Sequence, residues 1–285
     1  MKRTDFRYLD RQRVRWAEVD LQRIVFNGHY LMYFDTAVAG WWRAMALPYA
    51  PTMHTVAGDF YVRKATLEYE ASARYDEVIH TGVRCQRIGR SSMVLAAATF
   101  RDEQLLVHGE LVYVFADPAT QTSRPVPDVL RQWFEGYEAG EDMLALRSGG
   151  WAALGADIAP LRQAVFVGEQ QLPEALVHDA ADDEALHVVA RNRLGLAVGS
   201  GRLLQPEAGV GQIGRLATLA ALRGAGIGRR VLDALVEAAR ARGDRELMLQ
   251  ARTSATEFYR AAGFVVDGAT FEEAGHVHVT MRRRL

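Results

Sequence analysis

The sequence predicts an α+β protein with two domains: a long helix wrapped by an antiparallel sheet, then an α/β domain with a mixed sheet. Three observations lead to this prediction. The first half contains one strong helical pattern followed by four long strand-like runs. The second half alternates strands and helices around a glycine-rich loop, and the pattern changes near Met143. We place the domains at residues 1–140 and 141–285.

The first predicted domain begins with a helix in residues 29–47. Its apolar residues recur at spacings of three and four, which gives one broad apolar face: Leu31, Phe34, Val38, Trp41, Trp42 and Met45. We expect Pro48 and Pro51 to end this helix. Four strand-like runs follow, separated by turn residues, at residues 59–70, 76–89, 91–102 and 104–117. Residues 117–130 carry three prolines and are interpreted as a strand exit and a turn.

The second predicted domain follows a flexible joint that we expect at Ser148–Gly150. A helix leading into a loop is expected at residues 160–170, and a short helix at 254–263. A longer helix at 228–243 ends at Gly243. Strands are expected at residues 184–192, 193–204, 210–219, 246–251 and 276–281. Strand–helix–strand alternation favours parallel pairing around the glycine loop.

Composition limits the classes of protein that need be considered. Hydrophobic residues make up 49% of the 285 residues and charged residues 24%, so the chain can bury a core. The net charge of −1 does not indicate nucleic acid as a partner. The single cysteine, Cys85, excludes an intrachain disulfide and a cysteine-based zinc cluster. The charged N-terminus and the lack of a long apolar run favour a cytoplasmic protein without a membrane segment.

Three glycines, Gly224, Gly226 and Gly228, lie between an apolar run and a helical pattern. Glycine lets the backbone turn sharply, and a helix start presents unpaired amides to a phosphate or pyrophosphate. The P-loop pattern fails because Gly228 is followed by two arginines rather than Lys-Ser/Thr. The spacing also departs from the dinucleotide-binding G-x-G-x-x-G. From the glycines alone, a purely structural turn with a helix cap remains open.

The wider context of this loop carries a family resemblance. Arg223–Gly228 after Gly214–Leu219, together with Phe258–Phe264, resembles the acetyl-CoA loop of the GNAT acetyltransferase superfamily. Further segments make it similar to the ElaA-type branch over about residues 143–285: Arg162–Gln170, His187, Gly201–Leu204 and Phe271–Met281.

The GNAT resemblance implies roles for particular residues. The pyrophosphate of acetyl-CoA would lie on the loop formed by Arg223, Gly224, Ala225, Gly226, Ile227, Gly228 and Arg229. Main-chain groups of Leu216, Ala217 and Thr218 would pair with the pantetheine arm. Tyr259 would be the general acid for the leaving thiolate, or else an aromatic core residue. The base that accepts a proton from the amine would be Glu169 or a held water, and Glu169 is equally interpretable as a structural hydrogen-bonding residue.

Two histidines, His276 and His278, point to one face of the last predicted strand. Histidines at this spacing can bind zinc, but the sequence shows no third or fourth ligand. We therefore predict no metal, and favour polar packing or a wall of the acceptor pocket for both side chains.

In the first half, Asp20 precedes a turn, and a helix begins about eight residues later. A carboxylate near a helix N-terminus can attack a carbonyl that the helix amides polarise, or activate water to attack it. That arrangement suits thioester hydrolysis. On spacing alone, Asp20 can equally be a turn or capping residue.

The segment from Glu18 to Ala37, with Val62–Tyr69 and Ala73–Val78, resembles hotdog acyl-CoA thioesterases of the 4-hydroxybenzoyl-CoA and Tol-Pal-associated type. The resemblance covers about residues 8–137. It implies that Asp20 is the catalytic carboxylate, as nucleophile or general base. It also implies that the substrate contacts Asn27, Gly28 and His29, with the amide of Asn27 or Gly28 polarising the thioester carbonyl.

The chain departs from the hotdog pattern in two places. Leu21-Gln22-Arg23 follows the aspartate where the family often has glycine, and Asn27 and His29 stand where the Tol-Pal type usually has His and Asn. These changes bear on loop shape and acyl specificity. Hotdog domains pair because the acyl pocket lies between protomers, so a homodimer or higher homo-oligomer is expected.

Together the two resemblances imply a bifunctional coenzyme A enzyme. The first domain would hydrolyse an acyl-CoA thioester, and the second would transfer acetyl from acetyl-CoA to an amine. The alternative is an acyl-CoA-binding or regulatory protein without turnover. A hotdog dehydratase would require a catalytic histidine, and neither His29 nor His54 lies in a pattern typical of one.

Overall fold

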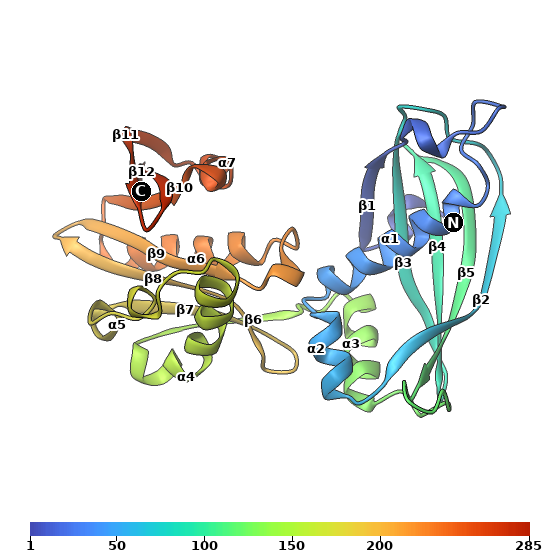
Figure 1. Cartoon of the computed structure of the whole chain (residues 1–285), viewed down its shortest axis with the longest axis horizontal. Coiled ribbons are helices and arrows are strands. Elements are labelled where there is room, and N and C mark those ends of the chain that lie inside the picture. Colours follow the sequence, from blue (N-terminus) through green and yellow to red (C-terminus); the bar gives the residue numbers. More distant parts are fainter. The chain divides into compact units, whose positions relative to one another are not determined.

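The computed structural model describes residues 1–285, and the chain divides into two compact units, Met1–Met143 and Leu144–Leu285 (Figure 1). Each unit has its own sheet and its own helices, so each is described separately. No helix in either unit combines the length and the apolar character needed to cross a membrane.

The first unit is built on a five-stranded sheet in the order β1-β3-β4-β5-β2, with every neighbouring pair antiparallel. Its strands are β1 (Tyr8–Arg13), β2 (Asp59–Tyr69), β3 (Val78–Ile88), β4 (Ser92–Arg101) and β5 (Gln104–Ala116). The four runs predicted from sequence form β2 to β5. The fifth strand, β1, was not predicted, and it pairs with β3 at the edge of the sheet.

Three α-helices belong to this unit: α1 (His29–Ala44), α2 (Tyr49–Thr55) and α3 (Asp128–Glu138). Helix α1 packs against β1, β3 and β4, and its Phe34, Ala37 and Trp41 are completely buried. Short 3-10 turns, Arg3–Asp5 and Trp16–Glu18, precede it. The antiparallel sheet around a long helix is confirmed, and the unit has the hotdog arrangement.

The prolines act differently from the prediction. Pro48 is the N-cap of α2, and Pro51 lies inside its first turn, where the missing amide hydrogen is harmless. The segment after β5 was predicted to be only an exit and a turn, but α3 begins at Asp128. The Trp41 ring stacks on Phe134 of α3 at a centroid distance of 5.5 Å, so α3 completes the aromatic core.

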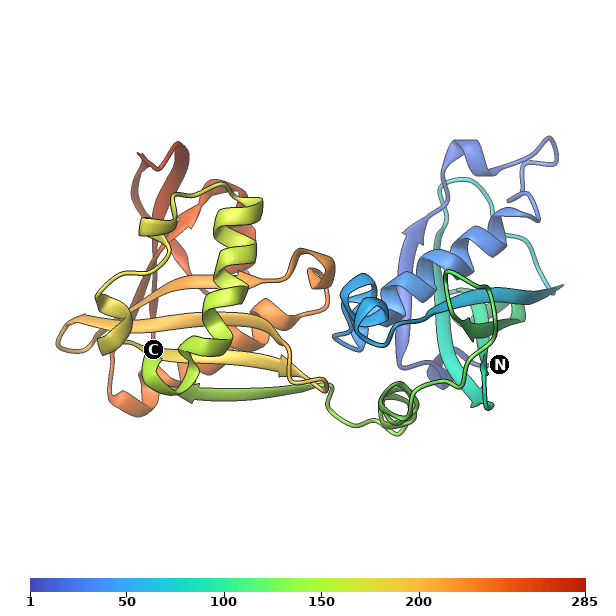
Figure 2. The same ribbon diagram turned by 60° about the horizontal axis from the view of Figure 1, so that its bottom comes forward.

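The second unit has a seven-stranded sheet in the order β11-β12-β10-β9-β8-β7-β6 (Figure 2). Only β9 and β10 are parallel, and the other neighbours are antiparallel, so the predicted mixed sheet is confirmed. Its strands are β6 (Leu144–Gly149), β7 (Leu186–Asn192), β8 (Ala197–Glu207), β9 (Val210–Thr218), β10 (Glu246–Arg252), β11 (Val265–Glu273) and β12 (His276–Arg284).

The helices of the second unit are α4 (Trp151–Arg162), α5 (Ala181–Glu184), α6 (Ile227–Arg242) and α7 (Thr256–Arg260). Helix α4 continues into a π-helical turn, Gln163–Glu169. Three 3-10 turns occur at Glu174–Leu176, Ala220–Leu222 and Thr253–Ala255. The predicted flexible joint is wrong, because Ser148 and Gly149 pair with Val188 and His187 as part of β6.

Candidate functional site

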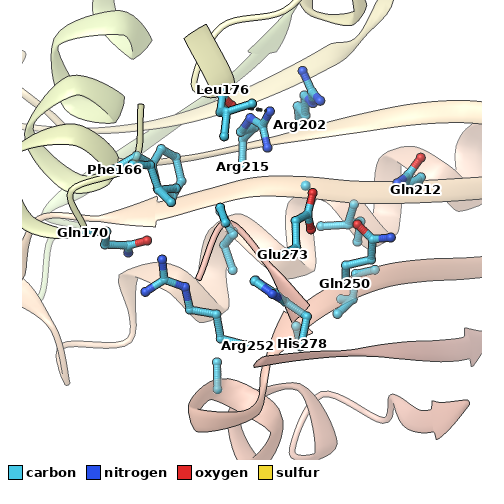
Figure 3. A pocket seen from close by; sticks show the side chains of 18 of the residues that line it. Phe166, Gln170, Leu176, Arg202, Gln212, Arg215, Gln250, Arg252, Glu273 and His278 are labelled. Carbon is cyan, nitrogen blue, oxygen red and sulfur yellow. Dashed lines mark hydrogen bonds between the residues drawn. The ribbon is translucent and has the colours of Figure 1, made fainter. Parts of the chain in front are cut away.

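In the second unit, a cavity of about 440 Å³ opens where β9 and β10 separate (Figure 3). The two parallel strands pair only from Glu246↔Val210 to Leu249↔Ile213. Beyond that point β9 continues to Thr218 on its β8 side and β10 to Arg252 on its β12 side. The separated ends therefore leave main-chain groups of β9 and β10 without a partner strand, facing one cavity.

A β-bulge shapes the β9 wall of the cavity. Ser200 pairs with Ala217 and Arg202 with Gly214, so two residues of β9 oppose one of β8. Arg215 lies in this bulge with a φ of 51°, a left-handed conformation that is unusual for a residue with a side chain. Bulges of this kind re-aim backbone and side-chain groups next to active sites.

The glycine loop ends in an array of unpaired amides. Gly224 and Gly226 have φ values of 85° and 79°, and a Cβ at either would meet no atom within 4 Å. Gly226 is the N-cap of α6, and the first amide of this helix to find an acceptor is that of Arg230. Backbone N–H groups without an acceptor are those of Gly224, Gly226, Ile227, Gly228 and Arg229. Such an array at a helix N-terminus is suited to a phosphate group.

The two arginines expected to contact the cofactor already have protein partners. Arg223 donates to both carboxylate oxygens of Glu169, at 2.6 and 2.7 Å. Arg229 binds Asp233 and donates to the Ala261 carbonyl oxygen at 2.9 Å. The hydrogen bonds from Arg223 lower the pKa of Glu169, and Glu169 does not line the cavity. Its position therefore suits a structural ion pair and gives no support to the predicted role as base.

Tyr259 of α7 lines the cavity, and its hydroxyl has no hydrogen-bond partner. Burial raises the pKa of Tyr259 to about 12, because the phenolate would be poorly solvated. The group therefore keeps its proton at neutral pH. A phenol in this state can donate a proton but cannot serve as a base.

His278 also lines the cavity, and two contacts fix its ring. Its Nδ1 lies 2.9 Å from the His276 carbonyl oxygen, and the Phe271 ring stacks on it with centroids 5.9 Å apart. A carbonyl oxygen only accepts, so Nδ1 carries the hydrogen and Nε2 of the neutral ring keeps a lone pair. The described residues contain no group of three or more His, Cys, Asp or Glu side chains placed to hold a metal ion.

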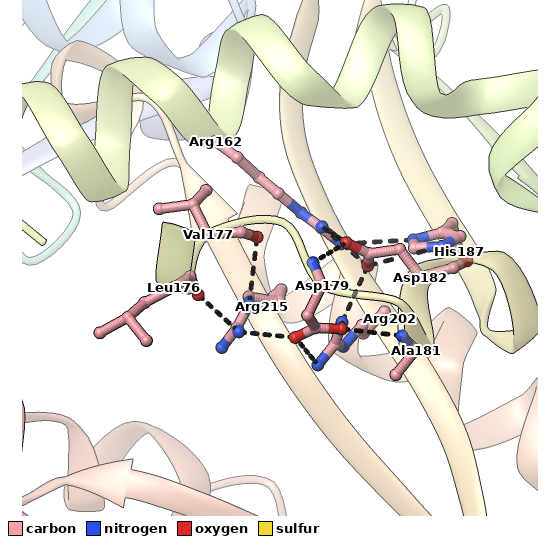
Figure 4. A network of polar contacts seen from close by, with 9 residues as sticks. All are labelled: Arg162, Leu176, Val177, Asp179, Ala181, Asp182, His187, Arg202 and Arg215. Atoms are coloured by element: carbon pink, nitrogen blue, oxygen red, sulfur yellow. Dashed lines mark hydrogen bonds and ion pairs between the residues drawn. The ribbon is translucent and has the colours of Figure 1, made fainter. Parts of the chain in front are cut away.

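A buried ionic network supports the β8–β9 wall of the cavity (Figure 4). Arg162 binds both carboxylate oxygens of Asp182 at 2.9 Å, and Arg202 bridges Asp182 and Asp179. Arg215 donates to Asp179 at 2.9 Å and to the Leu176 carbonyl oxygen at 2.6 Å. Burial alone would raise the pKa of Asp182, but the hydrogen bonds from the two arginines lower it overall. Sequence reasoning missed this network.

In the first unit, Asp20 lies at the tip of a short hairpin. Its backbone amide donates to the Ile24 carbonyl oxygen, and its Oδ1 accepts from the Gln22 amide at 2.8 Å. The next rungs pair Val19 with Val25 and Glu18 with Phe26. Asp20 is thus a turn residue in this structure, and one of its carboxylate oxygens has no protein partner.

The start of helix α1 lies beyond the other end of that hairpin. The backbone amides of Asn27 and Gly28 have no acceptor, whereas the His29 amide donates to the Phe26 carbonyl oxygen. Within one chain, the hairpin therefore separates Asp20 from the free amides by three residue steps, roughly 10 Å. No hydrogen bond joins the Asp20 carboxylate to Asn27, Gly28 or His29.

A second carboxylate, missed from the sequence, anchors this hairpin. Glu18 is only 4% exposed, and its carboxylate accepts from the Tyr33 hydroxyl at 2.8 Å and the Arg15 amide at 2.7 Å. Burial would raise the pKa of Glu18, but these bonds and the Arg15 guanidinium lower it overall. Glu18 thus ties the hairpin to α1.

Comparisons with known proteins agree with this division. Residues 154–285 match the acetyltransferase (GNAT) domain, and residues 22–108 match the thioesterase superfamily. The uncharacterized N-acetyltransferase YjcF of Bacillus subtilis is 33% identical over 124 residues, which cover 43% of this chain and 87% of that protein.

Solved structures of both kinds are also similar. An acyl-CoA N-acyltransferase from Pseudomonas aeruginosa is 30% identical with a TM-score of 0.45, covering 49% of this chain and 99% of that one. A probable thioesterase from Bartonella henselae is 18% identical with a TM-score of 0.37, covering 42% of this chain and 97% of that one.

The family matches support an enzyme of two general kinds in one chain, an acyltransferase and a thioesterase. The chain belongs to the GNAT acetyltransferases through its C-terminal unit, and residues 22–108 of its N-terminal unit match the thioesterase superfamily. Both families use coenzyme A esters as substrates.

Proposed function

We propose that the protein is a bifunctional coenzyme A enzyme. The second unit transfers acetyl from acetyl-CoA to an amine, and the first hydrolyses an acyl-CoA. Acetyl transfer is supported by the set of five free loop amides, which lie in the same unit as the cavity between β9 and β10. The amides suit the pyrophosphate, and the unpaired edge of Leu216–Thr218 suits the amide groups of pantetheine.

In the transfer reaction, the neutral amine attacks the acetyl carbonyl carbon, a C–N bond forms, and the C–S bond breaks. The amine nitrogen must lose a proton, and the thiolate must gain one. We infer that the free Nε2 of His278 accepts the first proton and that the protonated Tyr259 supplies the second. His278 thus takes the role predicted for Glu169, whose carboxylate is held by Arg223.

Calorimetric titration with acetyl-CoA tests this assignment, followed by thiol release after an amine mixture is added. Binding followed by amine-dependent thiol release supports the transferase. Binding without release would favour the alternative of a coenzyme A-binding protein. If acetyl-CoA does not bind, the assignment of the glycine loop to its pyrophosphate is wrong.

In the first unit, we infer that the Asp20 carboxylate attacks the acyl-CoA carbonyl or activates water, while a free amide at the start of α1 polarises that carbonyl. The unpartnered oxygen of Asp20 and the free amides of Asn27 and Gly28 support this role. Asp20→Asn is the most informative variant, because it removes the carboxylate while its amide oxygen can still accept the hydrogen bond from the Gln22 amide and keep the turn.

Thiol release from acyl-CoAs of different chain length, without any amine, measures this activity. Asp20→Asn should lower the rate by at least about 10²-fold. An unchanged rate in the variant would show that Asp20 is not the catalytic carboxylate. An unchanged thermal unfolding profile of the variant is the control for folding of the first unit, and acetyl-CoA binding is the control for the second.

We infer further that a second copy completes the thioesterase site, since the hairpin separates Asp20 from the free amides of its own chain. Edge strand β2 has no neighbour on one side, and Val62 and Tyr69 on it are each more than half exposed. Sedimentation equilibrium should give at least twice the chain mass of 31.7 kDa. A monomer that hydrolyses acyl-CoA would contradict this arrangement.

A further inference from the structure

The cavity between β9 and β10 contains two opposite charges without protein partners. Arg202 and Arg215 line it too, but both are bound by Asp179. The Arg252 guanidinium, in contrast, makes no hydrogen bond or ion pair, and neither does the Glu273 carboxylate. The Arg252 charge helps to lower the pKa of Glu169 without contacting it directly, and Glu273 is exposed, so both charged groups remain available to pair with a ligand.

The strand register brings these groups to one place. Arg252 of β10 lies directly opposite His278 of β12, and Glu273 of β11 lies opposite His276. In Figure 3 the guanidinium of Arg252 lies on one side of the His278 ring, toward Gln170, and the carboxylate of Glu273 lies on the other side. Cation, base and anion therefore follow one another along this wall.

We propose that the acetyl acceptor is a small zwitterion, an amine that also carries a carboxylate, as free amino acids do. Its carboxylate pairs with Arg252 and its ammonium group with Glu273. The ammonium loses one proton to solvent, the resulting amine attacks the acetyl carbon, and Nε2 of His278 accepts the second proton as described above. This inference rests on the proposed transferase function and specifies its substrate class.

The remaining walls of the cavity agree with a small polar acceptor. Side-chain amides of Gln170, Gln212 and Gln250 line the cavity and can donate to a carboxylate or accept from an ammonium group. The volume of about 440 Å³ must also admit the acetyl end of the cofactor, which leaves room for a small molecule. A simple monoamine would leave Arg252 unpaired, and a polyamine would place positive charge beside it.

The test uses the full chain with saturating acetyl-CoA and follows thiol release. The acceptors are L-alanine, L-serine, L-phenylalanine and β-alanine, each beside its own carboxamide at the same pH, with kcat/KM expressed per total acceptor concentration. At least one amino acid should exceed its carboxamide by about tenfold or more. In Arg252→Gln this ratio should fall to near one, whereas Glu273→Gln should raise the KM for both acceptors and keep the ratio.

Arg240→Gln is the matched control, because Arg240 is an exposed arginine on α6 paired with Glu237 and lies outside the cavity. It should keep the wild-type ratio. Equal or faster acetylation of every carboxamide would overturn the zwitterion proposal while leaving the transferase function intact. So would acetyl-CoA binding without turnover of any amino acid. Failure to bind acetyl-CoA would overturn the transferase function itself.

Discussion

Replacing Gly226 by alanine should weaken acetyl-CoA binding as well as destabilise the fold. Gly226 caps α6 with a φ of 79°, and its missing Cβ faces open space. Alanine in this left-handed conformation costs roughly 1–2 kcal/mol. If the backbone relaxes to avoid that strain, the free amides of Gly226 and Ile227 turn away from a bound pyrophosphate.

The expected loss of affinity follows from those amides. A hydrogen bond to a charged group contributes about 1.5–3 kcal/mol, so losing one should raise the Kd at least about tenfold. At a concentration 100 times the wild-type Kd, acetyl-CoA stabilises the wild type by about 2.7 kcal/mol. A tenfold weaker variant would gain only about 1.4 kcal/mol under the same conditions, so the shift in Tm should be about halved.

Gly243→Ala is the matched control for this variant. Gly243 caps the opposite end of the same helix with a φ of 90°, and a Cβ added there would likewise meet no atom within 4 Å. Both variants should show a similar drop in Tm without ligand, and only Gly226→Ala should lose calorimetric affinity for acetyl-CoA. Equal affinities in the two variants would refute the assignment of the loop to pyrophosphate.

Further outcomes follow from the two sites. Tyr259→Phe should lower kcat for acetyl transfer by about 10²-fold and leave acetyl-CoA affinity unchanged. Burial raises the pKa of Tyr259 to about 12, so this group does not lose its proton below pH 10. Any decrease of the wild-type rate between neutral pH and pH 10 should therefore also occur in the variant. The pKa of Glu18 is lowered in the folded state, so its stabilising contribution is complete above its unfolded pKa of about 4.3 and is lost as pH falls through the folded value. The free energy of unfolding should therefore fall less steeply with decreasing pH in Glu18→Gln than in the wild type. The same pH dependence in both proteins would contradict the buried hydrogen bonds of Glu18.

Much of the fold was predictable because its elements have strong local patterns. Strands β2 to β5 and helix α6 have regular apolar spacing and clear turn residues. Strand β1 was missed because Asp10-Arg11-Gln12-Arg13 is polar, and only pairing with β3 makes it a strand. Helix α3 was missed because the three prolines before it dominate the local pattern, although Leu130, Trp133 and Tyr137 already have helical spacing.

The sites were less predictable, since they depend on contacts between distant segments. The loop glycines and Tyr259 could be proposed from motifs. The pairing of Glu169 with Arg223, 54 positions away, leaves no mark in either local sequence. The bulge at Arg215 depends on the register between two strands. His278 was expected either in polar packing or at a wall of the acceptor pocket, but its tautomer follows from a carbonyl contact that only the structure gives.

The most direct test is a crossed measurement of both activities in one set of chains. Thiol release from acyl-CoA without amine reports hydrolysis, and formation of an acetylated amine reports transfer, in wild type, Asp20→Asn and Tyr259→Phe. Two independent coenzyme A sites predict that Asp20→Asn loses only hydrolysis and Tyr259→Phe only transfer. Loss of both activities in either folded variant, or of neither in both, would contradict a chain with two separate catalytic units.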